Sequence, residues 1–384
     1  MTRFEFATAT RIVFGPGCAS QLPGIAKELG AVRPLVVTGN NPSRWAEVVG
    51  ALQSAGLRTS SFTIGAEPTL ARVRQGADLA RACDSVIAIG GGSVIDGAKA
   101  IAALATNAGD VLDYLEVIGK SRPLTAAPLP FFAVPTTAGT GSEVTRNAVL
   151  ASPEHGVKAS LRSPMMLAKA AIVDPDLTRE LPPHLTASTG LDALTQLIEP
   201  YVTPRANHLT DALCLDGMRR AAVHLPRAFA DGNDTEAREN MSLASLYGGL
   251  ALANAGLGVV HGFAAPIGGM FDAPHGAVCA AVLPHGMKAN LQALRERAKD
   301  QVALTRYAEV ARTLTGDSAA TAEDGVRWVS QLCGRLKVPP LRTYGIGEGH
   351  IQDLVDKAAK ASSMKANPIV LTAAELTHVM EHAL

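Results

Sequence analysis

The sequence predicts two domains: an α/β domain over residues 1–180, built on a parallel sheet with helices on both faces, and an all-helical domain over residues 181–384. Short apolar runs alternate with helical patterns through the first half, and glycine-rich turns follow two of these runs. Beyond Thr186, alanine- and leucine-rich helical patterns replace the strand signals. Alternating strands and helices are typical of a parallel sheet, and ligands bind beyond the carboxyl ends of such strands.

The expected elements of the first half follow one another as strand and helix in turn. Residues 1–15 alternate apolar and polar side chains in the manner of a strand. The other expected elements are strands at Pro34–Thr38, Leu57–Ile64, Val86–Ile89 and Phe131–Pro135, and helices at Trp45–Ala55, Leu70–Cys83 and Val94–Ala105. Pro182 and Pro183 suit a hinge or linker, which places the domain boundary near residue 180.

The segment from Ser85 to Lys99, SVIAIGGGSVIDGAK, combines a buried strand, a glycine turn and the start of a helix. Glycines allow the backbone to turn tightly and to approach a ligand closely. Free N–H groups and the positive end of the helix dipole then favour a phosphate, and we expect Ser93 to cap the helix. The motif is neither GxGxxG nor a P-loop. An ordinary tight turn between strand and helix is the alternative.

A second turn, PTTAGTGSE, follows the strand that ends at Pro135. It carries four hydroxyl side chains, which are those of Thr136, Thr137, Thr140 and Ser142. A purely structural loop needs fewer such groups, whereas a nucleotide offers phosphate and ribose oxygens for them to bind. Two turns of this kind at neighbouring strand ends favour a dinucleotide.

The end of the first buried strand bears on the choice between NAD and NADP. Sites selective for NAD often place an acidic residue there to bind the ribose hydroxyls. This chain has Gly39, Asn40 and Asn41 instead, with Arg44 nearby in sequence. We therefore assign Gly39 to the cofactor site and leave NAD and NADP both open.

Composition excludes several classes of function. The 384-residue chain has 35 basic and 35 acidic residues, so no net charge draws it to nucleic acid or anionic lipid. Its 4% aromatic content argues against platforms that stack single-stranded bases. The five cysteines form no CxxC pair, which fits reduced thiols. Signal-peptide and membrane-spanning patterns are also lacking, so we expect a cytoplasmic protein with no nucleic-acid or membrane partner.

Three places in the helical half carry residues able to do chemistry. Asp192 and Gln196 stand at i and i+4 of a predicted helix, capped by Ser188 or Thr189, so they share one face. His261 and His275 lie in GLGVVHGF and FDAPHGAV. These four side chains could hold a divalent metal. Alternatively, Asp192 favours a helix N-terminus, Gln196 is solvated and His261 is a hydrogen-bonded core histidine. Spacing leaves both interpretations open.

Over nearly its whole length the chain resembles the iron-containing (group III) alcohol dehydrogenases. The resemblance rests on several long motifs in the right order: GGGSVIDGAK at 90–99, PTTAGTGSE at 135–143, AIVDPDL at 171–177, GLDALTQLIEPYV at 190–202, HGFAAPIGG and PHGAVCAAVLPH. It implies a Rossmann-like dinucleotide-binding domain followed by an all-helical domain, the architecture shared with dehydroquinate synthase. It also implies a catalytic metal and a substrate in the cleft between the domains.

The resemblance assigns roles to particular residues. Gly91, Gly92, Ser93 and Asp96 match the pyrophosphate loop, Thr136, Thr137 and Ser142 match the second cofactor loop, and Lys158 matches a lysine of the cofactor groove. Asp192, His261 and His275 match three of the four metal ligands and are the expected catalytic residues.

Two residues depart from the family pattern. Gln196 stands where the fourth ligand is usually histidine, and Ala265 stands where a second histidine, often taken as the proton relay, usually follows the one at 261. The amide oxygen of Gln196 is a weaker donor than imidazole toward late transition metals. We expect iron in this site, with zinc as the alternative.

The resemblance implies an NAD(P)-dependent oxidoreductase that interconverts an alcohol and an aldehyde or ketone by metal-assisted hydride transfer. It also implies a homodimer or larger oligomer acting on a small molecule. Three alternatives remain. One is a maleylacetate-reductase-like enzyme for a carboxylated substrate, and another is a sugar-phosphate cyclase of the dehydroquinate-synthase type. The third, suggested by Gln196 and Ala265, is a nucleotide-binding protein with a degenerate catalytic site.

Overall fold

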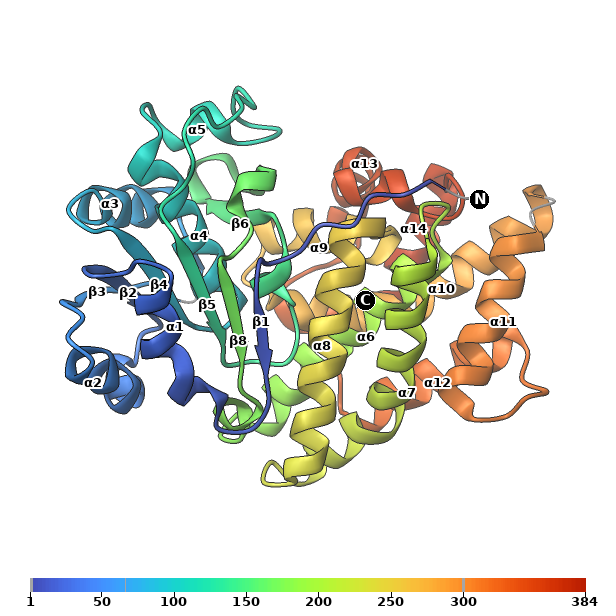
Figure 1. Cartoon of the computed structure of the whole chain (residues 1–384). Helices are drawn as coiled ribbons and strands as arrows, with labels where there is room; N and C mark the ends of the chain where they lie inside the picture. Colours follow the sequence, from blue (N-terminus) through green and yellow to red (C-terminus); the bar gives the residue numbers. More distant parts are fainter. Residues whose placement is uncertain (1–2, 66, 299–300) are drawn as a thin grey trace. The chain divides into compact units, whose positions relative to one another are not determined.

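The computed structural model describes residues 3–65, 67–298 and 301–384, which form two compact units (Figure 1). The first, here called the sheet unit, comprises Ala7–Thr137 and Gly141–Arg179. The second, here called the helical unit, comprises the described residues from Glu180 to Leu384, with 3–6 and Ala138–Thr140. The tip of the PTTAGTGSE turn is therefore grouped with the helical unit, and the rest of that turn with the sheet unit.

Six parallel strands form the main sheet, in the order β1–β8–β5–β4–β2–β3 (Figure 1). Their bounds are β1 Ile12–Phe14, β2 Pro34–Thr38, β3 Ser60–Thr63, β4 Ser85–Gly90, β5 Phe131–Pro135 and β8 Ala170–Val173. The four central strands are buried throughout, so they show as apolar runs in the sequence. Gly90 pairs with Pro135, so the two glycine-rich turns leave the sheet side by side. The predicted parallel sheet is confirmed.

Helices cover both faces of this sheet. They are α1 Leu22–Glu28, α2 Ala46–Ser54, α3 Leu70–Ala80 and α4 Gly92–Thr106. The first two pack on one face, where Leu22 and Leu52 join Ile87 and Phe132 in one apolar cluster. The other two lie together on the opposite face, and a Cβ on Gly76 of α3 would lie 2.3 Å from the Ile101 side chain of α4. Glycine at this position therefore lets the two helices pack closely.

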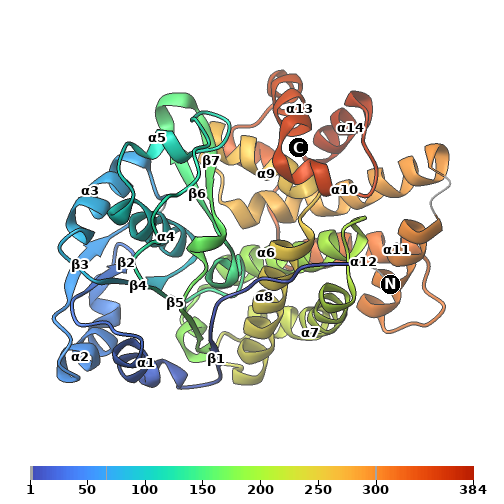
Figure 2. The same ribbon diagram turned by 45° about the horizontal axis from the view of Figure 1, so that its top comes forward.

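The sheet unit differs from the prediction at three places. Of the strand expected over residues 1–15, residues 1–2 lie outside the described part, and only Ile12–Phe14 form a strand, because only these three pair with β8. The strand expected at 57–64 is limited to β3 in the same way, by its pairing with β2. An antiparallel hairpin, β6 Asn147–Ser152 and β7 Val157–Arg162, was missed (Figure 2). A short helix, α5, spans Val111–Tyr114.

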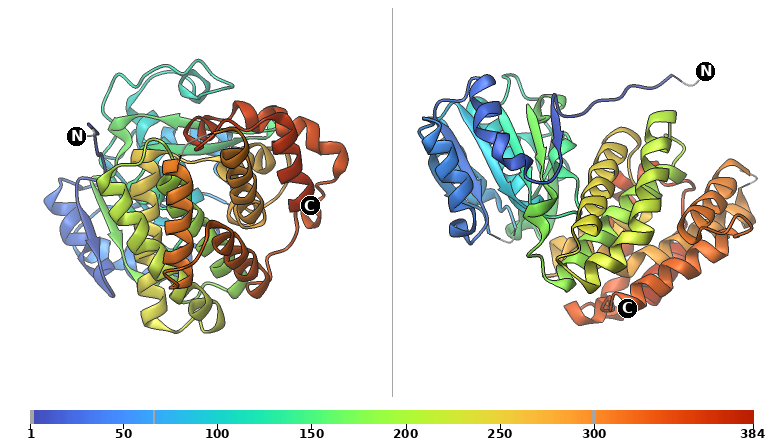
Figure 3. Two further views of the ribbon diagram at one scale, coloured as in Figure 1. Left: turned by 90° about the vertical axis from the view of Figure 1, so that its right-hand side faces the viewer. Right: turned by 60° about the horizontal axis from the view of Figure 1, so that its bottom comes forward.

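Long helices form the other unit, and α6, α7 and α8 pack against one another (Figure 3). The helices are α6 Pro183–Val202, α7 His208–Ala230, α8 Thr235–Ala255, α9 Val259–Met270, α10 His275–Arg297, α11 Gln301–Thr315, α12 Ala322–Arg335, α13 Ile351–Lys360 and α14 Ala373–Ala383. Their inward faces form one continuous apolar core. The all-helical character predicted for this half is confirmed.

The start of α6 corrects the expectation that Ser188 or Thr189 caps this helix. Pro182 is the N-cap and Pro183 the first residue of this helix, so the two prolines begin α6 shortly after the sheet unit ends at Arg179. Proline is well suited to the first helical position, where its missing N–H costs no hydrogen bond. Ser188 and Thr189 consequently lie inside the helix and cap nothing, and their hydroxyls donate to the Leu185 carbonyl oxygen.

Taken singly, no helix among the described residues is both long and apolar enough to cross a bilayer. The pair α8 and α9 meets the requirement by length and composition, although its two helices are bent by 99°.

Candidate functional site

One face of α6 carries three buried polar side chains. Asp192, Gln196 and Glu199 follow one another at i, i+4 and i+7, and each is 6% exposed or less. Asp192 lies in the middle of this helix, so it is not a residue of the helix N-terminus. The alternative of a solvated Gln196 is also wrong, because this side chain is 2% exposed.

Two glycines allow neighbouring helices to approach this face of α6. A Cβ on Gly258, the N-cap of α9, would lie 2.9 Å from Oε1 of Glu199. A Cβ on Gly276, in the first turn of α10, would lie 2.4 Å from the Ser188 carbonyl oxygen. Any larger residue would push these helix starts away from α6. The helices of His261 and His275 therefore begin in close contact with α6, through the Glu199 side chain at Gly258 and through the backbone at Gly276.

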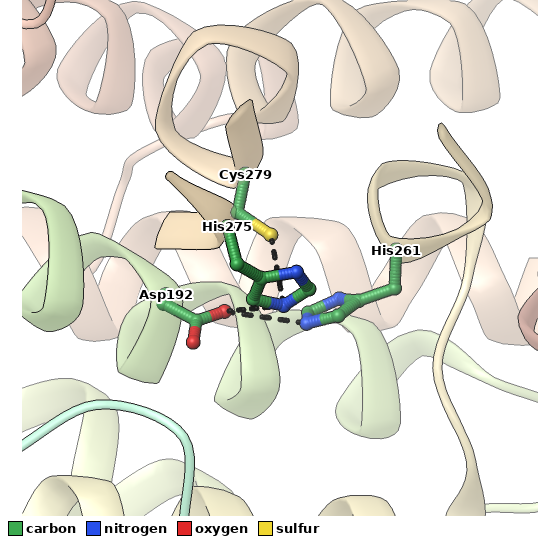
Figure 4. Close-up of side chains that lie close together, drawn as sticks. All are labelled: Asp192, His261, His275 and Cys279. Atoms are coloured by element: carbon green, nitrogen blue, oxygen red, sulfur yellow. Dashed lines mark hydrogen bonds and ion pairs between the residues drawn. The ribbon is translucent and has the colours of Figure 1, made fainter. Parts of the chain in front are cut away.

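Four side chains converge where α6, α9 and α10 meet (Figure 4). Oδ1 of Asp192 lies 3.3 Å from Nε2 of His261 and 3.7 Å from Nε2 of His275. Cys279, one turn after His275, places its Sγ 3.7 Å from that same nitrogen. One ligand atom from each of the four residues lies within 4.8 Å of the other three. We call these four residues the Asp–His–Cys cluster.

Unpartnered polar atoms show that this cluster fits a metal ion. In the described part of the chain, Oδ1 of Asp192, Nε2 of His261 and Oε1 of Gln196 are buried and lack a hydrogen-bond partner. Such atoms are rare in proteins because an unpaired buried polar group costs about 1–3 kcal/mol. Carboxylate oxygen and imidazole nitrogen are both ligands of divalent metals. The structure therefore brings together the predicted ligands Asp192, His261 and His275.

Glu199 orients His261. Its Oε2 accepts a hydrogen bond from Nδ1 of His261 at 2.6 Å, and its Oε1 accepts one from the Val260 backbone N–H at 2.7 Å. Since a carboxylate only accepts, Nδ1 carries the proton and Nε2 keeps the lone pair that a metal needs. His261 is thus hydrogen-bonded in the core and is free to ligate at its other nitrogen. The sequence interpretation missed Glu199, although its spacing from Asp192 and Gln196 was a usable signal.

The cluster is electrostatically prepared for a cation. Burial alone raises the pKa of Asp192, but the neighbouring His275 and His261 outweigh it and hold that pKa below its ordinary value. Burial lowers the pKa of both histidines, but the neighbouring Cys279, together with Glu199 for His261 and Asp192 for His275, outweighs burial and raises it. His275 also keeps 38% of its side chain exposed, so the cluster has a side open to solvent.

The predicted phosphate-binding turn lies between β4 and α4 in the sheet unit. Gly91 is the N-cap of α4 and no side chain caps this helix, so the expectation that Ser93 does so is wrong. The helix begins at Gly92, one residue before Ser93, because the backbone at Gly91 is extended. Its first N–H groups therefore lack a side-chain acceptor, the arrangement that suits an anion. Thr137 of the second turn lies close by, 3.2 Å from where a Cβ of Gly91 would be.

The two turns are joined by Asp96, Lys99 and Ser142. The Ser142 hydroxyl donates to the Asp96 carboxylate, which also accepts a bond from the Val149 backbone N–H at 2.9 Å. The buried Lys99 ammonium donates to the carbonyl oxygens of Ser142 and Asn147, both at 2.8 Å. Asp96 and Ser142, which were predicted to bind the cofactor, thus also hold the two turns together. The contribution of Lys99 to this connection was not predicted.

The remaining predicted cofactor residues are placed as follows. Gly39 directly follows β2, and Thr136 follows β5, where its backbone N–H donates to the Gly90 carbonyl oxygen at 3.0 Å. Lys158 on β7 is partly buried, with 8% of its side chain exposed, and donates from Nζ to Glu67 at 2.8 Å.

Comparison with known proteins identifies relatives along the whole chain. Residues 9–175 match the family described as iron-containing alcohol dehydrogenase, and residues 186–384 match the C-terminal part of the Fe-containing alcohol dehydrogenase family. Alcohol dehydrogenase 4 of Schizosaccharomyces pombe is 35% identical over 379 residues, covering 97% of this chain and 87% of the relative. The NAD-dependent methanol dehydrogenase of Bacillus methanolicus is 33% identical and covers 100% of both chains.

Solved structures agree with this result. The crystal structure of a 1,3-propanediol oxidoreductase superposes with a TM-score of 0.92 at 32% identity, covering 100% of both chains. The order of strands and helices described above is therefore that of a known group of oxidoreductases.

Proposed function

Because this chain belongs to the iron-containing alcohol dehydrogenase family, we propose that it interconverts an alcohol and an aldehyde or ketone, with a nicotinamide dinucleotide as hydride carrier. The observation that supports this most directly is the Asp–His–Cys cluster with its unpartnered buried atoms. The relative named as NAD-dependent supports NAD as a cofactor. We propose that NADPH can take the place of NADH, because no acid directly follows β2.

A divalent metal is the second cofactor in this proposal. Asp192, His261 and His275 would hold it, with Asp192 supplying negative charge and Glu199 fixing the proton of His261 on Nδ1. When bound, such an ion polarises a carbonyl oxygen and stabilises the developing alkoxide. Both imidazoles must be neutral to ligate, so metal affinity falls as the pH drops. We propose iron as the ion, with zinc as the alternative.

The sheet unit supplies the nucleotide site in this proposal. The N–H groups at the start of α4 would bind the pyrophosphate, and Thr136 and Thr137 would donate to phosphate or ribose oxygens. Gly91 keeps the backbone of this turn accessible to the ligand. We also propose a homodimer or larger oligomer and a cytoplasmic location, both of which remain predictions.

One assay tests the proposal. The oxidation of NADH and NADPH is followed over a panel of aldehydes, ketones and oxoacids, on protein whose metal content has been measured. His261→Ala should lose metal and carbonyl reduction together while it still binds nucleotide. Full activity without any metal, or an undiminished rate in His261→Ala, would contradict the mechanism. A preference for oxoacids would favour the carboxylated-substrate alternative. Nucleotide binding without net oxidation would favour the cyclase or the degenerate site.

A further inference from the structure

Cys279 belongs to the cluster, although no cysteine was among the predicted ligands. It lies in α10, one helical turn after His275, and its side chain is fully buried. All five cysteines of the chain are free, so this thiol is not consumed by a disulfide. We infer that Cys279 is a metal ligand, so that the centre is built from one carboxylate, two imidazoles and one thiolate. This inference rests on the proposed function, because it concerns the same metal.

The distances between donor atoms support this inference. Four donors at the corners of a tetrahedron, about 2.0–2.3 Å from a central zinc ion, lie roughly 3.3–3.8 Å from one another. The three measured separations in the cluster are 3.3, 3.7 and 3.7 Å, and the last is the one from Sγ of Cys279 to Nε2 of His275. These three of the six separations match those between ligands of one ion, and the other three are within 4.8 Å.

Cys279 is a better fourth ligand than Gln196. Oε1 of Gln196 is buried without a partner, but it lies beside α8, 3.5 Å from where a Cβ of Gly248 would be. An amide is also neutral, whereas a thiolate adds a second negative charge to that of Asp192, and together they balance a divalent ion. Metal binding converts the Cys279 thiol to the thiolate and releases its proton to the solvent.

The inferred donor set also indicates which metal the chain selects. Thiolate sulfur is a soft ligand that favours zinc, and a tetrahedral set with sulfur and imidazole is typical of zinc sites. The inference therefore shifts the expected metal from iron toward zinc. Cobalt(II) is a suitable spectroscopic substitute, because a cobalt–thiolate bond produces a near-ultraviolet charge-transfer absorption that oxygen and nitrogen ligands do not.

The test uses metal-free protein titrated with cobalt(II) under anaerobic conditions. His378, Glu381 and His382 on α14 form an exposed group that could also take cobalt. All proteins in the experiment therefore carry His378→Ala and His382→Ala, so that bound cobalt reports on the buried cluster. The protein whose cluster residues are unchanged should bind one cobalt ion tightly and show the charge-transfer band. Cys279→Ser should lose the band and weaken binding at least tenfold, while keeping the visible absorption of bound cobalt.

Two controls make the result specific. Cys333→Ser removes another buried thiol, which donates to the Ala280 carbonyl oxygen next to Cys279, and it should leave the band unchanged. Gln196→Ala should keep both the band and the cobalt affinity, because the amide is not a ligand. If Cys279→Ser fails to fold, the protein with unchanged cluster residues and its Cys333→Ser variant still test the inference. A band present in both proteins requires a bound thiolate other than that of Cys333.

Failure of the inference differs from failure of the proposed function. Cobalt bound at the cluster without a charge-transfer band, or a band that survives Cys279→Ser, would show that Cys279 is not a ligand, while the proposed function would stand. If the cluster takes no cobalt and His261→Ala changes nothing, the metal itself is absent and both proposals fail.

Discussion

Oε2 of Glu199 lies 2.6 Å from Nδ1 of His261, and both side chains are buried. Through this bond one helix determines which nitrogen of the imidazole on another helix remains available. The same carboxylate accepts a hydrogen bond from the Val260 backbone N–H, so it also satisfies a donor at the start of α9. Glu199 is thus a positioning residue for the proposed metal centre.

Glu199→Gln should therefore weaken metal binding. The carboxylate of Glu199 accepts hydrogen bonds from His261 Nδ1 and from the Val260 backbone N–H. The amide of glutamine turns an NH₂ group toward one of these two donors, so one of the two hydrogen bonds is lost. Outer-shell partners of this kind typically contribute about 10- to 100-fold in metal affinity. Competition with a chelator followed by elemental analysis measures the change. Glu309→Gln is the matched control, because Glu309 accepts a bond from the Tyr201 hydroxyl elsewhere in the helical unit. Equal retention in both variants would contradict the positioning role.

Gly39→Asp should shift cofactor preference toward NADH. A Cβ at Gly39 would have its nearest neighbour, a methyl carbon of Val94, at 3.9 Å, so a side chain fits there without strain. The new carboxylate would repel the 2′-phosphate of NADPH and accept a bond from the ribose hydroxyl of NADH. Steady-state kinetics with both cofactors measure the shift.

The same experiment tests why the wild type should accept both cofactors. Gly50→Asp adds the same charge to α2, where a Cβ meets nothing within 4 Å, and should change neither cofactor's kinetics. A wild-type preference for NADH above about a hundredfold, near 2.7 kcal/mol, would show that another group selects against the 2′-phosphate.

Gly91→Ala should weaken the binding of either cofactor. The added methyl group stands at the N-cap of α4, where we propose that the pyrophosphate meets the backbone. It also comes within 3.2 Å of a Thr137 methyl carbon, which must shift by a few tenths of an ångström. Calorimetric titration measures the affinity, and Tm should stay near that of the wild type. Gly24→Ala in α1, where a Cβ meets nothing within 4 Å, is the control. Unchanged affinity would place the pyrophosphate elsewhere.

Lys99 should make stability depend on pH in the alkaline range. Burial lowers the pKa of its ammonium group from 10.5 to about 8, although Asp96 and Glu143 oppose that shift. Between these two values the unfolded chain binds more protons than the folded one, so the free energy of unfolding rises with pH. The rise amounts to at most about 3 kcal/mol and is lost as the pH falls through 8.

Urea unfolding at several pH values from 7.5 to 10.5 measures this contribution. Lys99→Met should lack the rise that the wild type shows, whereas Met in place of the exposed Lys169 should keep it. Parallel curves for wild type and Lys99→Met would mean that Lys99 keeps its ordinary pKa in the folded protein.

Local patterns in the sequence were sufficient to predict the buried central strands of the sheet. The strands Pro34–Thr38 and Phe131–Pro135 were predicted to the residue, because a strand buried on both faces needs an apolar run that is visible in isolation. Pairing with a neighbour decided the rest, so the edge strands β1 and β3 came out shorter than their sequence patterns. The hairpin of β6 and β7 was missed, and the start of α6 was placed too late because Ser188 and Thr189, which are typical N-cap residue types, lie inside the helix.

For the candidate metal site, helical spacing placed Asp192 and Gln196 on one face of a predicted helix. His261 and His275 stood out in the sequence as possible further ligands, and the resemblance to a known family assigned that role to both histidines and to Asp192. Which atoms meet was decided by packing. Glu199 and Cys279 join the site because α9 and α10 begin against α6 at Gly258 and Gly276. Contacts between residues about 60 to 90 positions apart leave no local period in a chain. The position of a fourth donor is therefore a property of the tertiary structure.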